Sequence, residues 1–244
     1  MDIKILTIFP EMFTGPLTTS IIKKARDKEI LKIKVINFRD YSENKHNTVD
    51  DYPFGGGAGM LLKPEPIVNA LENNLDLENN NQEIILVTPQ GKTFKQEDAN
   101  LLATKKNLTF ICGHYEGFDE RIRSYVTKEY SLGDFVMTGG EIPAMAMVDA
   151  IARLIPGVIK EEDSFKDDSF FGGLLEYPQY TRPRVFRDIE VPEVLLSGNH
   201  EHIRKWRRKE SLRRTYKRRP ELLMNFQFTK EDKKFLEEIK KEEK

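Results

Sequence analysis

Apolar and polar positions along the first 160 residues switch between a two-residue period and a helical period. Short runs rich in β-branched residues predict five strands, at residues 3–9, 33–37, 84–88, 108–112 and 135–137. The segments between them predict helices at residues 20–28, 65–75, 95–105, 118–126 and 141–154. Strands that alternate with helices indicate an α/β fold, in which helices cover both faces of a mainly parallel sheet.

This alternation stops near residue 160. Residues 161–175 are charged and contain two Asp-Ser-Phe tripeptides, so we expect a flexible linker there. From residue 191 onward only helical patterns recur, at 199–206, 210–218 and 229–241, and Thr229 suits an N-cap with Asp232 three positions later. We therefore expect an α/β domain at 1–160, the linker at 161–175 and a small all-helical domain at 176–244.

Charge is unevenly distributed along the chain. The net charge is -1, yet residues 200–220 contain ten Lys and Arg against two Glu, with Trp206 and Tyr216 among them. Because arginine binds phosphate and aromatic rings stack on bases, this segment predicts nucleic-acid binding, the alternative being a solvated amphipathic helix. The arginines expected to bind are Arg204, Arg207, Arg208, Arg213 and Arg214.

Other features exclude several protein classes. Cys112 is the only cysteine, which excludes an internal disulfide and a cysteine metal cluster. His200 and His202 point in different directions on a helix, so we predict no metal site. Asp149 and Arg153 interrupt the apolar stretch at 142–159, which indicates a buried helix and not a membrane span. The first residues suit a core strand and not a signal peptide, so we expect a soluble, cytoplasmic protein without a membrane partner.

Three predicted strands run into glycine, in the segments 84–91, 111–117 and 132–140. Glycine lets a ligand approach the backbone, and loops at the ends of parallel strands are where α/β proteins bind ligands. These segments predict one ligand pocket, although they also suit ordinary strand-to-helix turns. The glycine-dense loop at 47–60 matches neither a P-loop nor G-x-G-x-x-G, and we expect it to shape a pocket for a base or to be a plain surface loop.

Two kinds of charged residue are candidates for chemistry. Arg153 lies four residues after Asp149 on an apolar helix, where it could form an intrahelical pair or stabilise an oxyanion in a pocket. Asp163, Asp167 and Asp168 lie in the linker, where acids are usually solvated but where a mobile segment can also supply a general base.

Motifs in a fixed order along nearly the whole chain resemble those of the bacterial tRNA (guanine-N1)-methyltransferases, members of the SPOUT superfamily that modify guanosine 37 of tRNA. The motifs are Phe9-Pro-Glu-Met-Phe13, Thr48-Val-Asp-Asp51, Gly55-Gly-Gly-Ala-Gly-Met60, Pro89-Gln-Gly91, Gly113-His-Tyr-Glu-Gly117, Asp119-Glu-Arg121, Gly133-Asp134, Gly139-Gly-Glu141, Ile155-Pro-Gly157, Tyr180-Thr-Arg-Pro183, Leu195-Leu-Ser-Gly-Asn-His200 and Arg219-Pro-Glu-Leu-Leu223.

The resemblance implies a deep trefoil knot around residues 84–140 that binds S-adenosylmethionine, and a homodimer whose active sites are shared between subunits. Such knots run against the general topology of proteins, and nothing in the composition predicts one. The residues implied to hold the cofactor are Leu86, Pro89, Gly91, Gly113, Tyr115, Gly117, Leu132, Gly133, Asp134, Phe135, Val136, Met137, Gly139 and Gly140.

The resemblance also implies catalytic roles. The family's catalytic Asp begins an Asp-Ser-Phe, and counting back from Gly173-Leu-Leu-Glu176 selects Asp168 over Asp163 as the base, with Arg153 stabilising O6 of guanine. Glu116 is a candidate to read the guanine edge, and we expect Asp50, Gly55, Gly57 and Gly59 to contact substrate. The family's magnesium requirement would act elsewhere, because the sulfonium methyl is already electrophilic.

This chain departs from the family pattern at two positions: Glu176 stands where Asp is common, and His114 where Arg is common. Two rival functions remain at the level of sequence. One is a SPOUT methyltransferase that acts on another RNA, such as rRNA. The other is an RNA-binding protein without catalysis.

Overall fold

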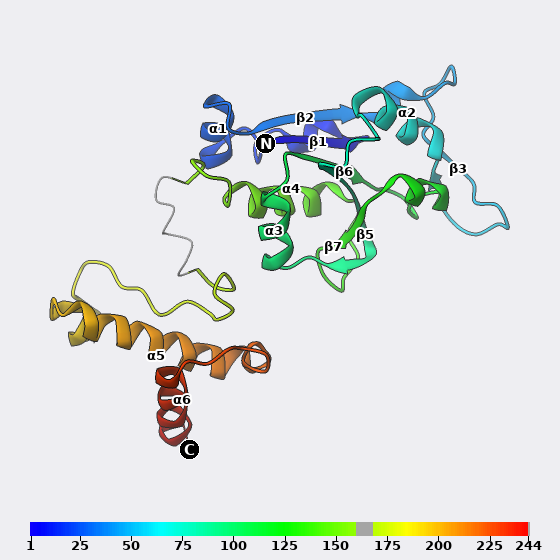
Figure 1. Ribbon diagram of the computed structural model, residues 1–244. Helices are drawn as coiled ribbons and strands as arrows, with labels where there is room; N and C mark the ends of the chain where they lie inside the picture. Colours follow the sequence, from blue (N-terminus) through cyan, green and yellow to red (C-terminus); the bar gives the residue numbers. More distant parts are fainter. Residues whose placement is uncertain (160–167, 244) are drawn as a thin grey trace. The chain divides into compact units, whose positions relative to one another are not determined.

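A computed structural model describes residues 1–159 and 168–243 of the chain (Figure 1). The chain divides into two compact units, Met1–Glu162 and Asp163–Lys244. The first unit is α/β and holds most of the strands and helices predicted from the alternating pattern, whereas the second is built mainly of helices.

The strands of the first unit are β1 (Asp2–Thr7), β2 (Lys32–Asn37), β3 (Asp50–Asp51), β4 (Leu61–Leu62), β5 (Gln82–Thr93), β6 (Asn107–Cys112) and β7 (Lys128–Ser131). The α-helices are α1 (Ser20–Asp27), α2 (Pro64–Asn74), α3 (Gln96–Ala103) and α4 (Glu141–Ala152). Three short 3-10 segments are η1 (Pro10–Phe13), η2 (Phe38–Tyr41) and η3 (Glu120–Tyr125).

Five strands form a parallel sheet in the order β2-β1-β6-β5-β7. β5 therefore lies between β6 and β7, although it precedes both in the sequence. β7 pairs with β5 at Ile85–Val87 and again at Lys92–Thr93, and the register shifts between these two stretches. Residues 88–91 of β5 therefore bulge out of this register beside β7.

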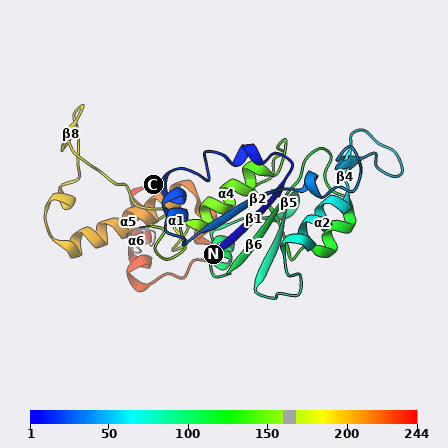
Figure 2. The ribbon, with the colours of Figure 1, turned by 90° about the horizontal axis from the view of Figure 1, so that it is seen from above.

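Alternate residues of the central strands build two apolar layers. On one face, Ile85 and Phe110 pack with α1, α3 and α4, and on the other, Leu86 and Ile111 pack with α2 and η3. Figure 1 shows α3 and α4 on one side of the sheet and α2 on the other, and Figure 2 shows α4 and α2 on opposite sides as well. The predicted parallel sheet with helices on both faces is confirmed, and the burial of both faces explains why its central strands are continuously apolar.

Two predicted elements of the first unit differ from the structure. Residues 135–137 were predicted as a strand, but they lie in the loop between β7 and α4, and the fifth strand is Lys128–Ser131. The predicted helix at 118–126 is the shorter 3-10 segment η3. In both places local residue preference was overridden by tertiary contacts: Lys-Glu-Tyr-Ser forms a strand because it pairs with β5.

The second unit contains the hairpin strands β8 (Val185–Phe186) and β9 (Ile189–Glu190), helices α5 (His200–Arg218) and α6 (Lys230–Glu242), and the 3-10 segments η4 (Glu193–Leu196) and η5 (Pro220–Leu223). α5 is one helix where the sequence pattern suggested two. Thr229 caps α6, and Asp232 completes the capping box, as predicted. Leu174, Leu212 and Ile239 form the small core of this unit.

Part of the segment expected to be a linker is ordered against α5. The Leu175 amide donates to the Thr215 hydroxyl at 2.9 Å, and the Ser211 hydroxyl donates to the Leu175 carbonyl. Asp163, at the first of the two Asp-Ser-Phe tripeptides, lies outside the described residues, whereas Asp168 of the second lies within them.

Candidate active site

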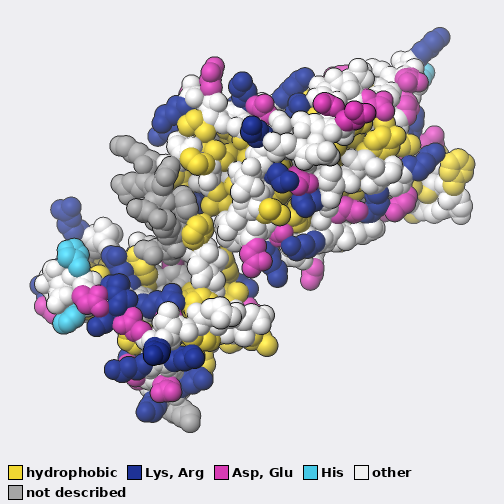
Figure 3. All heavy atoms as spheres, in the orientation of Figure 1, with side chains coloured by type: hydrophobic (Ala, Val, Ile, Leu, Met, Phe, Trp, Pro, Cys, Tyr) yellow, Lys and Arg dark blue, Asp and Glu magenta, His cyan; other side chains and the backbone are white. Residues whose placement is uncertain are grey.

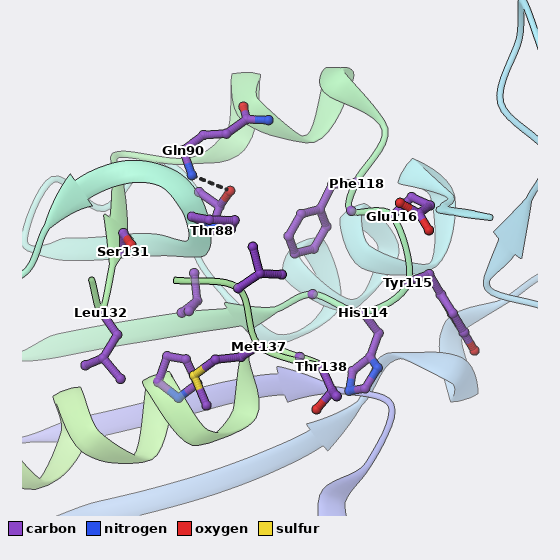
Figure 4. A pocket seen from close by; sticks show the side chains of 18 of the residues that line it. Thr88, Gln90, His114, Tyr115, Glu116, Phe118, Ser131, Leu132, Met137 and Thr138 are labelled. Carbon is purple, nitrogen blue, oxygen red and sulfur yellow. Dashed lines mark hydrogen bonds between the residues drawn. The ribbon is translucent and has the colours of Figure 1, made fainter. Parts of the chain in front are cut away.

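A cavity of about 290 Å³ lies at the carboxyl ends of β5, β6 and β7. Three segments surround it, residues 87–90, 113–118 and 130–140, and Figure 4 shows their side chains around the space. These segments correspond to the three glycine-ended runs noted in the sequence, of which the third is a loop and not a strand. The structure therefore brings them together around one cavity.

Most residues expected to hold a cofactor line this cavity. They are Pro89, Gly113, Tyr115, Gly117, Leu132, Phe135, Val136, Met137, Gly139 and Gly140. Four others do not line it. Leu86 packs in the core with α2. At Gly91 an added Cβ would be 2.5 Å from the Tyr130 backbone nitrogen. A glycine is therefore needed there because β5 and β7 pack closely at this position. Gly133 and Asp134 lie in the same loop as the lining residues but outside the lining.

Two glycines are required by close approach of the backbone around the cavity. The Gly140 amide donates to the Gly113 carbonyl at 2.9 Å, and a Cβ on Gly140 would be 2.9 Å from the Gly113 nitrogen. A Cβ on Gly113 would be 2.5 Å from the Phe118 ring. Side chains at either position would push the cavity walls apart, because protein interiors have little spare space.

The glycine-dense loop is attached to the cavity through Glu116. The Glu116 side chain lines the cavity, and the backbone amide of Glu116 donates a hydrogen bond to the Met60 carbonyl at 3.0 Å. Gly59, with φ of +83°, lies so close to Glu116 that a Cβ would collide with that side chain. Asp50 anchors the loop in β3 by pairing with Leu62 of β4.

Gly55 and Gly57 lie in the same loop, between Asp50 and Gly59, and do not line the cavity. Beside them, the Phe54 side chain is fully exposed.

Sequence reasoning missed several lining residues, among them Gln90, Glu120 and Arg123. The Arg123 guanidinium donates to the Gln90 side-chain oxygen at 2.7 Å and pairs with Glu120 and Glu129. It thereby holds the loop at 88–91. No sequence signal pointed to it, because it lay within a segment predicted to be an ordinary helix.

Tyr130 also lines the cavity, but it is not suited to accept a proton. Its hydroxyl bonds to the Asp98 carboxylate at 3.1 Å. Burial and this carboxylate raise the pKa of Tyr130 to about 12. The phenol therefore stays protonated at neutral pH and acts as part of the wall.

Arg153 lies at the opposite end of α4 from the cavity. Gly140 caps the amino end of this helix and Arg153 its carboxyl end, thirteen residues later. At about 1.5 Å per residue, the two positions are about 20 Å apart. The Arg153 guanidinium of this chain is thus too far away to reach a group held in the cavity beside Gly140.

Asp168 lines a different cavity, of about 290 Å³, in the second unit. Arg204, Arg207 and Arg208 of α5 line the same cavity, together with Tyr177. The structure therefore brings the expected base together with three of the arginines expected to bind nucleic acid. Arg213 and Arg214 lie farther along α5 and outside this lining.

The acids of α6 neutralise part of the basic segment. Arg204 pairs with Glu231 at 3.0 Å, Arg208 with the buried Asp232 at 2.7 Å, and Arg213 with Glu242 at 2.6 Å. Figure 3 shows Lys and Arg side chains interspersed with acids on these helices.

Two of the expected arginines have different surroundings. The Arg207 guanidinium lies 4.8 Å from the centre of the Tyr177 ring, and its side chain is exposed. Arg214 donates to the Glu176 carbonyl at 3.4 Å. Arg207 is therefore the best placed of the five to meet an external anion.

Between residues 1–159 and 168–243, no group of three or more His, Cys, Asp or Glu is arranged to hold a metal ion. No helix in these ranges is long and apolar enough to cross a membrane.

Comparison with known proteins gives one consistent result. A model of the tRNA (Guanine-1)-methyltransferase family, TrmD, matches residues 1–225. A protein named tRNA (guanine-N(1)-)-methyltransferase from Staphylococcus haemolyticus is 57% identical over 244 residues, covering 99% of this chain and 98% of the relative. Proteins of the same name from Dictyoglomus turgidum and Bacillus subtilis are 56% and 55% identical, each covering 99% of this chain and 98% and 100% of their own lengths.

Proposed function

We propose that this chain, which belongs to the tRNA (guanine-1)-methyltransferase family, transfers the methyl group of S-adenosylmethionine to N1 of guanosine 37 of tRNA. The observation that carries the proposal is the cavity formed by the three glycine-ended segments in a chain matched to this family over residues 1–225. Since tRNA is the substrate, the cytoplasm is the compartment that the proposal implies.

The cavity suits S-adenosylmethionine. Its walls combine apolar side chains, polar side chains and backbone, and the glycines at 113, 117, 139 and 140 bring the main chain to the surface of the cavity. Backbone amides and carbonyls can recognise an adenine edge, and Leu132, Phe135 and Met137 offer apolar surface to its ring. The bound cofactor supplies an electrophilic methyl group on a sulfonium, so the transfer itself requires no metal.

The acceptor needs activation, because N1 of guanine carries a proton. In the proposed reaction, the Asp168 carboxylate takes this proton while N1 bonds to the methyl carbon. The carbon–sulfur bond breaks and its electron pair remains on sulfur, which leaves S-adenosylhomocysteine. The negative charge that develops on O6 is stabilised by the Arg153 guanidinium. Glu116, which lines the cavity, is the candidate to accept a hydrogen bond from the guanine edge.

We infer a homodimer in which two subunits share each active site. The support is the position of Arg153, about 20 Å along α4 from the cavity of its own chain. A guanine next to that cavity can contact an Arg153 only if the residue comes from a second subunit. Symmetric dimers permit such sharing, because each chain contributes its Arg153 to the partner's site and the partner contributes its own Arg153 in return.

The tRNA is proposed to bind α5 of the second unit. The exposed Arg207 and the cavity that it shares with Asp168 support this assignment. A phosphate bound there would lie in the same cavity as the carboxylate proposed as the base. The binding is therefore expected to be electrostatic and to weaken with salt.

We also propose that residues 84–140 form a deep trefoil knot. Two contacts support it. β7 is paired with β5 at the edge of the sheet, yet the loop that follows β7 returns to β6, where His114 bridges Gly139 and Gly140 bonds to Gly113. The chain thus crosses the position of β5 twice, as threading through the loop at 88–91 requires.

One experiment tests the function. The protein is incubated with labelled S-adenosylmethionine and matched tRNA transcripts that carry guanosine or adenosine at position 37, and the product nucleoside is identified. We expect 1-methylguanosine only from the guanosine transcript. Label incorporated into ribosomal RNA but not into tRNA would favour a methyltransferase with another substrate. Binding of tRNA without any transfer would favour a non-catalytic RNA-binding protein.

A further inference from the structure

Beside the cofactor cavity, two buried polar atoms face each other. The Glu141 side chain is fully buried at the start of α4, and its Oε2 lies 3.1 Å from Nε2 of His114. Neither atom has a hydrogen-bond partner among residues 1–159 and 168–243. The other carboxylate oxygen, Oε1, accepts a hydrogen bond from the Thr7 hydroxyl at 2.7 Å.

The His114 ring is held in place from two sides. The Phe9 ring meets it edge-on, with 4.6 Å between the ring centres. On another side lies Gly139, where a Cβ would collide with both His114 Nε2 and Glu141 Oε2. The next residue, Tyr115, has φ of +60°, a conformation that a non-glycine residue keeps only where its surroundings fix it. This local geometry indicates that the contact positions the loop.

The contact joins segments that are distant in sequence. Thr7 ends β1, His114 lies in the loop after β6, and Glu141 begins α4. His114 and Gly139 both line the cavity, and the loops that carry them form two of its walls. Figure 4 shows His114 next to Thr138, at the meeting point of these walls.

The charge on His114 decides whether its contact with the Glu141 carboxylate is attractive. A carboxylate removed from water is costly unless a cation or donor faces it, and an imidazole ordinarily loses its proton near pH 6.5. Among the described residues, the titratable groups that face the pair are the Tyr115 phenol and the Cys112 thiol, and burial and the Glu141 charge raise the pKa of that thiol. Neither group is a cation, so a protonated His114 is the available counter-charge.

We propose that His114 and Glu141 are positioning residues that draw the two cavity walls together while His114 carries a proton. Loss of that proton leaves the Glu141 carboxylate buried without a counter-charge, and the walls separate. Binding of the cofactor is then linked to protonation, and affinity falls as pH rises through the range in which His114 ionises. This inference rests on the proposed function only in that the ligand of the cavity is S-adenosylmethionine.

Calorimetric titration with S-adenosylhomocysteine at several pH values between 6.0 and 8.5 tests the proposal. Wild-type affinity should fall at least about tenfold over this range, since one coupled proton gives up to about tenfold per pH unit. His114→Arg, which keeps a charge, should change by less than about twofold. His114→Gln and Glu141→Gln should bind weakly at every pH. His46→Gln, at an exposed histidine of the same unit, is the matched control and should follow the wild type.

Equal pH profiles for wild type and His114→Arg would overturn the proposal, as would wild-type affinity in His114→Gln at pH 6.0. A second measurement needs no ligand: hydrogen exchange of the Gly140 amide, which bonds to the Gly113 carbonyl. After correction for intrinsic exchange, its protection should fall with pH in the wild type but not in His114→Arg. If protection behaves so while S-adenosylhomocysteine never binds, the cofactor assignment fails and the positioning pair stands. If protection of the Gly140 amide in the wild type does not change with pH, the proposal that His114 and Glu141 position the walls is wrong.

Discussion

At the scale of single residues, the cofactor cavity depends on the absence of side chains. Gly113 and Gly140 meet backbone to backbone, so the space between the cavity walls has no room for a Cβ. Gly59 lies against the Glu116 side chain with no room for a Cβ, which joins the glycine-dense loop to a residue of the cavity wall.

Gly113→Val tests this dependence. The branched side chain would collide with the Phe118 ring, which an added Cβ already approaches to 2.5 Å. We expect S-adenosylmethionine binding to fall at least about a hundredfold, because overpacking here forces the walls apart. Calorimetry measures the affinity, and a wild-type circular dichroism spectrum checks folding. Unchanged affinity in a folded variant would place the cofactor elsewhere.

Asp168→Ala tests the base. We expect the rate of the methyl-transfer step to fall at least about a hundredfold, the lower end for loss of a general base. Asp163→Ala is the matched comparison from the other Asp-Ser-Phe tripeptide, and it should stay within severalfold of wild type. Single-turnover kinetics at saturating tRNA and cofactor isolate this step from binding. The reverse pattern, with Asp163→Ala inactive, would move the catalytic assignment by one tripeptide.

At the scale of elements, α5 uses its arginines for two purposes. Arg208 pairs with the buried Asp232 of α6, whereas Arg207, one residue earlier, is exposed and stacks on Tyr177. Successive helical residues point about 100° apart, so a single helix can hold its partner helix with one arginine and face a ligand with the next.

Arg208→Ala should destabilise the second unit by about 3 kcal/mol at neutral pH, because it leaves a buried carboxylate unpaired. Burial alone would raise the pKa of Asp232, but the Arg208 guanidinium and the Thr229 cap hold that pKa below its usual value. The stabilisation is therefore present above about pH 4 and is lost as pH falls further. Thermal unfolding of variant and wild type should differ most at neutral pH and converge below about pH 4. A constant difference at all pH values would contradict this role.

Arg207→Ala should affect tRNA binding more than stability. It should cost less than about 1 kcal/mol of stability, as expected for an exposed cation over an aromatic ring. It should weaken tRNA binding and lower the slope of log affinity against log salt by about 1, because one phosphate contact is lost. Filter binding across a salt series measures both quantities. Unaltered tRNA affinity at moderate salt would reduce Arg207 to a surface cation.

The sequence predicted elements well wherever local pattern and tertiary role agree. The apolar strands at 84–88 and 108–112 are buried on both faces, and Thr229 and Asp232 cap α6 as their spacing indicated. Prediction failed where a segment's role is set by a distant partner. Lys128–Ser131 is a strand only through β5, and the apolar run at 135–137 lines a cavity instead of forming a strand. Lysine and arginine counts likewise could not reveal that the acids of α6 neutralise several cations of α5.

At the scale of the whole molecule, the proposed catalytic groups are divided among separate places in the chain. The cofactor cavity lies in the first unit, Asp168 lies in the second, and Arg153 is at the far end of α4 from the cavity. Sequence motifs could suggest each residue but not which subunit supplies it, because that depends on contacts between chains. A mixing experiment can decide the point.

Two inactive variants should restore activity to each other if the active site is shared. In a dimer of Gly113→Val with Arg153→Ala, one site combines the intact cavity of the Arg153→Ala chain with the intact Arg153 of the Gly113→Val chain. Random exchange of subunits makes about half of all dimers mixed, each with one working site of two, so about a quarter of wild-type activity should return. Methyl transfer after denaturation and co-refolding of equal amounts measures this recovery, with each variant refolded alone as control. If every site were built from a single chain, each mixed dimer would carry one chain without a cofactor site and one without Arg153. No activity would then return, and the shared-site proposal would be wrong.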